Sequence, residues 1–158
     1  MALQNTYPDM CTSSAEGIVL SDHVAVCGAV ASECSVAMME VFRQTDLPMI
    51  SPGSTTALLS NIARYPSFFR TTPSAIAFGQ ALARMTNAAG FNCAVVVTDM
   101  TLQANIETTA SFHQEASLLG ISVAKEFVVP AEADDRAGYR QLLLDVWDQG
   151  VGVIVVSL

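Results

Sequence analysis

A loop rich in hydroxyl groups is where residues able to do chemistry are most concentrated in this sequence. It reads Ser51-Pro52-Gly53-Ser54-Thr55-Thr56, and a short helical turn is expected directly after it, at 57–61. Backbone amides and hydroxyls that converge at the start of a helix favour binding of an anion, and a carboxylate is the expected ligand. Hydroxyl oxygens also accept from an ammonium group, so a zwitterion fits this loop as well. The alternative is an ordinary Ser/Thr helix cap, which is a frequent role of these residues.

Common catalytic motifs are missing from the sequence. The phosphate-binding pattern G-x-x-x-x-G-K-[ST] does not occur, and Lys125 is the only lysine. Gly28 stands alone where a dinucleotide-binding fold has G-x-G-x-x-G, and there is no G-x-S-x-G elbow. His113 falls inside an expected helix, which favours a core or surface role over a Ser-His-Asp set. Asp134 and Asp135 would diverge on a helix, so capping explains them better than a carboxylate pair. We therefore predict no catalytic residues and no enzymatic activity.

The four cysteines do not form a metal-binding pattern. Cys11, Cys27, Cys34 and Cys93 contain no C-x-x-C pair, and the chain has 2 histidines. A tetrahedral zinc site is therefore disfavoured, and we predict neither a metal nor a cofactor. Cys27 and Cys93 lie in β-branched apolar runs, which is typical of buried free thiols. Cys11 and Cys34 lie in more polar surroundings, where a disulfide closing a loop of about 23 residues would contribute roughly 3 kcal/mol in an oxidising compartment.

Length and charge exclude several classes of protein. A chain of 158 residues suffices for about one domain core, and a net charge of −8 disfavours binding to nucleic acid. Charged residues make up 14% against a usual ~25%, while 51% are hydrophobic. Disorder is thereby excluded, and a surface partly covered by something else is expected.

Nothing in the sequence predicts a membrane span or a secretion signal. The longest apolar run, 151–156, contains Gly152 and is far short of the ~18 residues that a span needs. Residues 1–10 lack the basic and apolar regions of a signal peptide. The apolar run at the end of the chain reads as a strand, and we expect the chain to be a piece of a longer protein.

Apolar runs and helical patterns alternate along the chain, which predicts an α/β fold with a parallel sheet. Near-continuous apolar strands such as 94–97 are typical of sheets covered by helices on both faces. The expected strands are 24–30, 48–51, 68–71, 93–98, 122–129 and 151–157, and the expected helices are 35–45, 74–89, 102–119 and one from Asp134-Asp135 to about 147. Ligands bind parallel sheets at the carboxyl ends of strands, so the segments 29–35, 51–56 and 98–103 are the candidate ligand loops.

Two long phrases in the sequence resemble one family. They run from Pro48 to Ser60 and from Tyr65 to Ala75, and the second reads aromatic-Pro-x-Phe-Phe-Arg-Thr-x-Pro-Ser-Ala. They resemble the receptor-family ligand-binding region, the bilobed Venus flytrap domain similar to type 1 periplasmic binding proteins. The likeness is strongest to γ-aminobutyric acid type B and metabotropic glutamate receptor ectodomains. It implies a parallel-sheet sandwich with parts of two lobes, 1–91 and 92–158.

The resemblance also implies which residues contact a ligand. Ser32 falls where the family offers a hydroxyl to the ligand carboxylate, and Ser54, Thr55 and Thr56 fall where it holds the amino-acid end. A family disulfide from Cys11 to the Ser32 loop would use Cys34 here. Two features differ: Glu33 stands where relatives keep a small residue, and Ala104-Asn105 stand where the glutamate receptors supply a Tyr-Gly step.

The function implied is that of a ligand-binding module on the extracellular side of the plasma membrane. It would belong to a membrane receptor of the class C G-protein-coupled kind, sense an amino acid or similar carboxylate-like small molecule by lobe closure, and form a homo- or heterodimer through the first lobe. The membrane would be reached through a downstream segment. The alternatives are a soluble substrate-binding protein of an amino-acid ABC transporter and the ectodomain of a receptor guanylyl cyclase.

Overall fold

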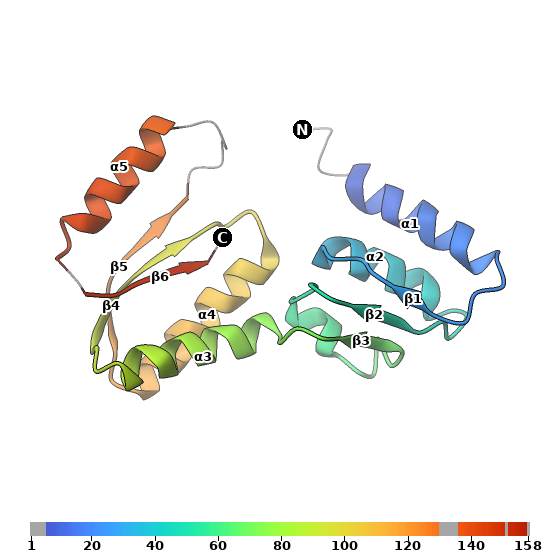
Figure 1. Ribbon diagram of the computed structural model, residues 1–158, viewed down its shortest axis with the longest axis horizontal. Coiled ribbons are helices and arrows are strands. Elements are labelled where there is room, and N and C mark those ends of the chain that lie inside the picture. Colours follow the sequence, from blue (N-terminus) through green and yellow to red (C-terminus); the bar gives the residue numbers. More distant parts are fainter. Residues whose placement is uncertain (1–5, 130–135, 151, 158) are drawn as a thin grey trace. The chain divides into compact units, whose positions relative to one another are not determined.

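The computed structural model describes residues 6–129, 136–150 and 152–157 (Figure 1). The chain divides into two compact units, Met1–Ser74 and Ala75–Leu158. This division comes earlier than the 91/92 boundary expected from the sequence. The reason is that helix α3 (Ala75–Ala88) packs along helix α4 (Gln103–Leu118) and therefore belongs with the second unit.

The first unit is built on a parallel sheet in the order β1-β2-β3. Its strands are β1 (Val26–Cys27), β2 (Met49–Ser51) and β3 (Phe68–Arg70), each inside a range expected from the sequence. Helix α2 (Ser32–Phe42) connects β1 to β2, and the 3₁₀ helix η1 (Ala57–Ser60) follows β2 where a short turn was expected. Helix α2 begins three residues before the predicted start at Ser35, so Ser32 is its first residue.

One face of this sheet carries the core of the first unit. Helix α1 (Thr6–Val19) packs against α2, and the disulfide Cys11–Cys34 joins them with a Cα–Cα distance of 5.4 Å. The pairing expected for these two cysteines is thus confirmed. Helix α1 itself was not predicted from the sequence. The largest buried side chains of this core are Met39, Phe42, Met49 and Tyr65.

The other face of the same sheet is apolar and exposed. Cys27, Ile50 and Phe69 are register partners across the three strands, and Ile50 and Phe69 are 40% and 56% exposed. The prediction that Cys27 is a buried thiol is wrong, since its side chain is exposed. Side chains alternate along a strand, and the two α-helices of this unit build the core on the face opposite to Cys27. Cys93 is a free thiol of intermediate exposure.

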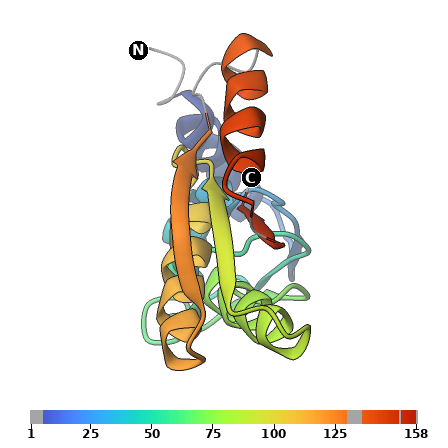
Figure 2. The same cartoon turned by 90° about the vertical axis from the view of Figure 1, so that its left-hand side faces the viewer.

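The second unit has a parallel sheet in the order β5-β4-β6, seen side by side in Figure 2. Its strands are β4 (Cys93–Thr98), β5 (Ser122–Val128) and β6 (Ile154–Ser157). Ala94 and Val96 pack with residues of α3 and α4, whereas Val95 and Val97 pack with Val146 of helix α5 (Arg136–Trp147). The central strand is therefore covered on both faces, as its continuous apolar run predicted. Asp134 and Asp135, expected to cap α5, lie outside the described residues.

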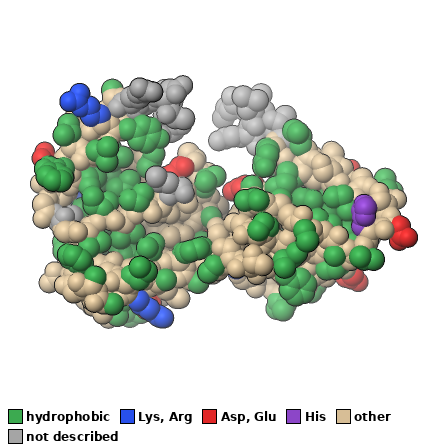
Figure 3. All heavy atoms as spheres, viewed as in Figure 1, with side chains coloured by type: hydrophobic (Ala, Val, Ile, Leu, Met, Phe, Trp, Pro, Cys, Tyr) green, Lys and Arg blue, Asp and Glu red, His purple; other side chains and the backbone are tan. Residues whose placement is uncertain are grey.

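Gly79 lets helices α3 and α4 approach closely. A Cβ atom at this position would lie 2.2 Å from the carbonyl oxygen of Thr108 and 2.7 Å from the amide nitrogen of Phe112. Across this contact, Ser111 Oγ donates to the carbonyl of Ile76 at 2.8 Å, and Arg84 pairs with Glu115 at 2.8 Å. The α/β class with parallel sheets is confirmed, and among the described residues no helix is both long and apolar enough to cross a bilayer. Figure 3 shows hydrophobic side chains at many places on the visible surface of each unit.

Candidate functional site

The carboxyl ends of β1 and β2 carry two polar loops at the same edge of the first sheet. One loop connects β1 to Ser32 at the start of α2, and the other runs from Ser51 to η1. Because parallel strands end at the same edge, these loops meet, and the edge is where open parallel sheets bind ligands. Both loops were among the candidate segments of the sequence analysis.

Small residues and buried hydroxyls hold the two loops together. A Cβ atom on Gly53 would lie 2.7 Å from Val30 Cγ1 and 3.2 Å from the Val30 carbonyl oxygen, so a glycine suits this close approach. Ser51 Oγ donates to the carbonyl of Ala29 at 2.5 Å. Ser54 is fully buried, and its Oγ lies 2.7 Å from Ser35 Oγ and 3.2 Å from the carbonyl oxygen of Val30. The side chain of Ser54, one of the expected ligand contacts, therefore forms hydrogen bonds that stabilise the two loops.

Ser32 also links the loops, and its hydroxyl group is free to donate a hydrogen bond. Its Oγ accepts from the backbone N–H groups of Thr55 at 3.1 Å and Thr56 at 3.2 Å. With both accepting positions used, the Ser32 hydroxyl proton has no acceptor among the described residues. Ala31 precedes the helix with no side-chain cap, so the positive end of α2 is available to a negative group. The arrangement suits a carboxylate oxygen.

The two threonines of the second loop have different roles. Thr56 is 3% exposed and its Oγ1 accepts from Leu58 N at 3.4 Å, so it caps η1. Thr55 is half-buried, and its side chain makes no hydrogen bond within the described part of the chain. The cap reading thus holds for Thr56, while the hydroxyl of Thr55 is available to a ligand. Ser32, Ser54, Thr55 and Thr56 all lie together at the sheet edge, and their role as ligand contacts stays a prediction.

Arg70, the last residue of β3, stabilises the second loop through hydrogen bonds. This role was not predicted from the sequence. Its Nη1 donates to the carbonyl oxygens of Ser54 at 3.2 Å and Thr56 at 3.0 Å, and its Nη2 donates to Ser60 Oγ. A guanidinium group can satisfy several acceptors at once because its donors are fixed in one plane. The sequence signal that could have indicated this role is the single positively charged residue, Arg70, at the end of an apolar strand.

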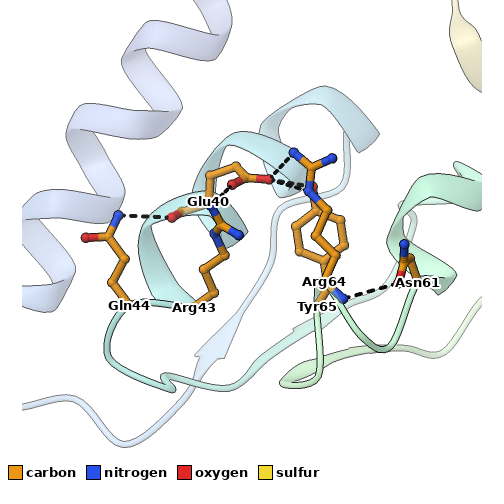
Figure 4. A network of polar contacts seen from close by, with 6 residues as sticks. All are labelled: Glu40, Arg43, Gln44, Asn61, Arg64 and Tyr65. Carbon is orange, nitrogen blue, oxygen red and sulfur yellow. Dashed lines mark hydrogen bonds and ion pairs between the residues drawn. The ribbon is translucent and has the colours of Figure 1, made fainter.

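A charged network links the segment after η1 to α2 (Figure 4). Glu40 Oε1 accepts from the hydroxyl of Tyr65 at 2.7 Å and from Nε of Arg64 at 2.9 Å, and Glu40 Oε2 pairs with Arg43 at 2.9 Å. The hydrogen bond from Tyr65 is the main cause that lowers the pKa of Glu40; partial burial opposes it, and both arginines add to the lowering. Burial, and then the bond to Glu40, raises the pKa of Tyr65 to about 12. The network places Tyr65 in the core of the first unit.

In the second unit, polar residues lie at the carboxyl end of the central strand, β4. Thr98 Oγ1 and Thr109 Oγ1 lie 2.8 Å apart, which joins the end of β4 to α4. Asp99 Oδ1 accepts from Thr101 N at 2.8 Å and holds the turn between them. His113 lies on α4 with its Nε2 3.3 Å from Glu126 Oε1. Among the described residues no group of three His, Cys, Asp or Glu side chains could hold a metal ion.

Comparison with known proteins identifies relatives of the chain. The family model described as "Receptor family ligand binding region" matches residues 4–158. Metabotropic glutamate receptor 6 of Rattus norvegicus is 32% identical over 69% of this chain and 12% of its own length. Taste receptor type 1 member 3 of Felis catus is 32% identical over 84% and 16%. G-protein coupled receptor family C group 6 member A of Homo sapiens is 30% identical over 85% and 15%. The chain therefore spans less than one fifth of each of these receptors.

A solved structure shares the fold. The solute-binding protein of an ABC transporter from R. palustris, in complex with benzoate, superposes with a TM-score of 0.79 at 19% sequence identity. The match covers 96% of this chain and 41% of that protein. Nearly the whole chain thus has the fold of a periplasmic binding protein, and that protein extends well beyond the matched part.

Proposed function

Because this chain belongs to the receptor-family ligand-binding regions, we propose that it senses an amino acid or a similar small carboxylate for a class C G-protein-coupled receptor. The family is one of ligand binding rather than catalysis, and three receptors of this kind are among its relatives. The two compact units would be parts of the two lobes, and ligand-driven closure of the lobes would carry the signal.

The observation that carries this proposal is the convergence of Ser32 and Thr55 at one sheet edge. Ser32 Oγ lies 3.1 Å from Thr55 N, next to the uncapped start of α2. A hydroxyl with a free proton and a helix N-terminus both favour a carboxylate, while the Thr55 hydroxyl can accept from an ammonium. Glu33, exposed and next to Ser32, adds a negative charge that favours the ammonium end of a zwitterion over a second carboxylate.

The place of action that we propose is the extracellular side of the plasma membrane. The disulfide Cys11–Cys34 supports it, since disulfides persist in oxidising compartments. In the whole receptor the first lobe would form a homo- or heterodimer, and a further segment of the protein would cross the membrane. Cross-linking of the full-length receptor on cells tests the dimer.

A second candidate function is that of a soluble solute-binding protein, favoured by the fold match to such a protein from R. palustris. The two functions differ in what else the protein contains, because a receptor needs a membrane-spanning portion and a carrier does not. Fractionation of the full-length protein separates them: recovery in the membrane after alkaline extraction supports the receptor, and recovery in the soluble fraction supports the carrier.

Binding at the first sheet edge is tested by calorimetric and thermal-shift titration with L-glutamate, γ-aminobutyrate, L-leucine and benzoate. Thr55→Val removes one hydroxyl without changing a described hydrogen bond, and Ser32→Ala removes the other. We expect each variant to weaken the binding of the best of these ligands about 10-fold, equivalent to one lost hydrogen bond of about 1.4 kcal/mol. Ser14→Ala, on the exposed face of α1, is the matched control. Unchanged affinity in both variants would remove this site.

A further inference from the structure

A small apolar pocket lies between α4 and β5 in the second unit. It is lined by Met100, Ile106, Thr109, Ala110, His113 and Glu126. Its volume is about 200 Å³, and an apolar cavity of about 150 Å³ can hold benzene, so one six-membered ring fits. The hydroxyl of Thr109 is already bonded to Thr98. The pocket therefore offers an incoming molecule apolar side chains and, at Glu126 and His113, two polar groups.

Glu126 is the acidic group of this pocket, and the strand register shows which face of the sheet it occupies. Glu126 pairs with Val96, and Val96 packs with residues of α3 and α4. Lys125 pairs with Val95, which packs on the opposite face with Val146 of α5. Because side chains alternate along a strand, the carboxylate and the neighbouring ammonium group point to opposite faces. Among the described residues, no lysine or arginine side chain lines the pocket beside Glu126.

The Glu126 carboxylate keeps capacity for a further partner. Its Oε1 lies 3.3 Å from Nε2 of His113, and its Oε2 has no partner in the described part of the chain. The side chains of Glu126 and His113 are 46% and 36% exposed, so a molecule can reach both from solvent. The ammonium group of Lys125 lies 4.8 Å from the centre of the Phe127 ring, on the other face of the sheet. A carboxylate with an unused oxygen thus stands at the side of an apolar pocket.

We propose that this pocket binds a small primary amine whose apolar body has the size of one six-membered ring. The ring would lie against Ile106 and Ala110, and the ammonium group would pair with Glu126. Hydrogen bonds between an ammonium group and a carboxylate are among the strong ones, and apolar surroundings strengthen them further. The net charge of −8 also favours a cation over an anion. None of these residues belongs to the first sheet edge, so this site is independent of the proposed function.

Four probes test the chemistry of the pocket in titrations of the 158-residue chain, followed by calorimetry and by ¹H–¹³C NMR of the methyl groups of Met100, Ile106 and Ala110. Benzylamine has the ring and the ammonium group, benzyl alcohol lacks the charge, sodium benzoate reverses it, and methylammonium chloride lacks the ring. We expect the three methyl groups to shift with benzylamine, which should bind at least 10-fold more tightly than each of the other probes. No methyl shift with benzylamine, or equally tight binding of benzyl alcohol or benzoate, overturns the inference.

A charge variant tests the pairing with Glu126. Glu126→Gln keeps the size of the side chain and should weaken the binding of benzylamine at least 10-fold, while the binding of benzyl alcohol stays the same. Glu107→Gln is the matched control, because it removes the same charge from α4 at a position outside the pocket lining. It should change the affinity for benzylamine less than 2-fold. Equal weakening in both variants would mean that long-range charge attracts the amine, which overturns the inference.

A filling variant tests the place of the ring. Ala110 is exposed and lines the pocket, so Ala110→Leu should occupy the space with its own side chain and leave the melting temperature unchanged. We expect this variant to weaken the binding of benzylamine at least 10-fold. Gln114→Leu, exposed on the same helix outside the lining, is the matched control and should bind benzylamine as the unmodified chain does. Unchanged affinity in Ala110→Leu, or an equal loss in both variants, overturns the inference.

Discussion

At the scale of single residues, the hydroxyl groups of the first sheet edge divide into two sets. Ser51, Ser54 and Thr56 are buried and bonded to the loops themselves. Ser32 and Thr55 keep hydrogen-bonding capacity for another molecule. The residues that hold the edge in shape thus leave two hydroxyls fixed in position before any ligand arrives, which reduces the entropy that binding must overcome.

The Tyr65 hydroxyl is a residue-scale test of the charged network. Tyr65→Phe removes the donor to Glu40 and should lower the free energy of unfolding by about 1–2 kcal/mol at pH 7, as expected for a bond to a charged acceptor. Urea unfolding measures the difference. Tyr7→Phe, with a side chain that is 54% exposed, is the control and should change nothing.

The same bond predicts how stability depends on pH. The folded pKa of Tyr65 is raised to about 12 from its ordinary value of 10.0, so its contribution is complete below pH 10 and is lost as the pH rises toward 12. The folded pKa of Glu40 is lowered, so its contribution is complete above about 4.5 and is lost in acid. Tyr65→Phe should therefore flatten the alkaline loss of stability. An equally steep alkaline loss in the variant would show that Tyr65 is not its source.

At the scale of elements, two close approaches determine how helices and loops are positioned. Gly53 brings the loop after β2 against the loop after β1, and Gly79 brings α3 against α4. The disulfide joins α1 to α2 in the same unit as the first approach. Each contact connects segments that are distant in sequence, so each acts on tertiary packing rather than on local helix formation.

Gly79→Ala tests the packing of α3 on α4. The added methyl group would lie 2.2 Å from the backbone oxygen of Thr108, so we expect a loss of about 2–3 kcal/mol from overpacking. Gly17→Ala in α1 is the matched control, because no atom lies within 4 Å of its added methyl group. That control should gain up to about 1 kcal/mol from helix propensity. Equal effects on thermal unfolding would contradict the close contact at Gly79.

At the scale of the whole molecule, low charge coincides with apolar surface that the chain leaves uncovered. The row Cys27, Ile50 and Phe69 runs across all three strands of the first sheet. The chain spans 41% of the solute-binding protein with the same fold and 12–16% of its receptor relatives. This row is one of several places where the chain leaves apolar side chains exposed, and coverage of such surface stays a prediction.

Phe69→Lys tests that surface. Phe69 is 56% exposed, so the charge should raise the solubility limit of the 158-residue chain with little change in melting temperature. Phe68→Lys is the matched control one residue away, on the face that packs against the core. It should lower the melting temperature strongly because it buries an unpaired charge. Static light scattering against concentration measures the first effect, and unchanged self-association of the Phe69 variant would contradict it.

Sequence patterns alone predicted the six strands and helices α2 to α5, whereas helix α1 (Thr6–Val19) was not predicted. Each of the six strands lies within its expected range. The reason is that buried parallel strands are continuous apolar runs, such as 94–97, that are easy to recognise. Helices α3 and α4 were predicted to within one or two residues of their ends, where Gly90 and Gly120 with positive φ end the helical pattern. The resemblance of two phrases also led to the correct family, and it brought Cys34 forward as the partner of Cys11.

Tertiary structure decided which polar groups are already used and which are available. The hydroxyls of Ser54 and Thr55 are adjacent and chemically alike, yet one is bonded to carbonyls across the loops and the other is not. The exposure of Cys27, the stabilising role of Arg70 and the position of Glu126 beside an apolar pocket likewise depend on atoms far away in the chain. Periodicity reports which face of its own element a residue occupies, but hydrogen-bond satisfaction depends on what the fold brings against that face.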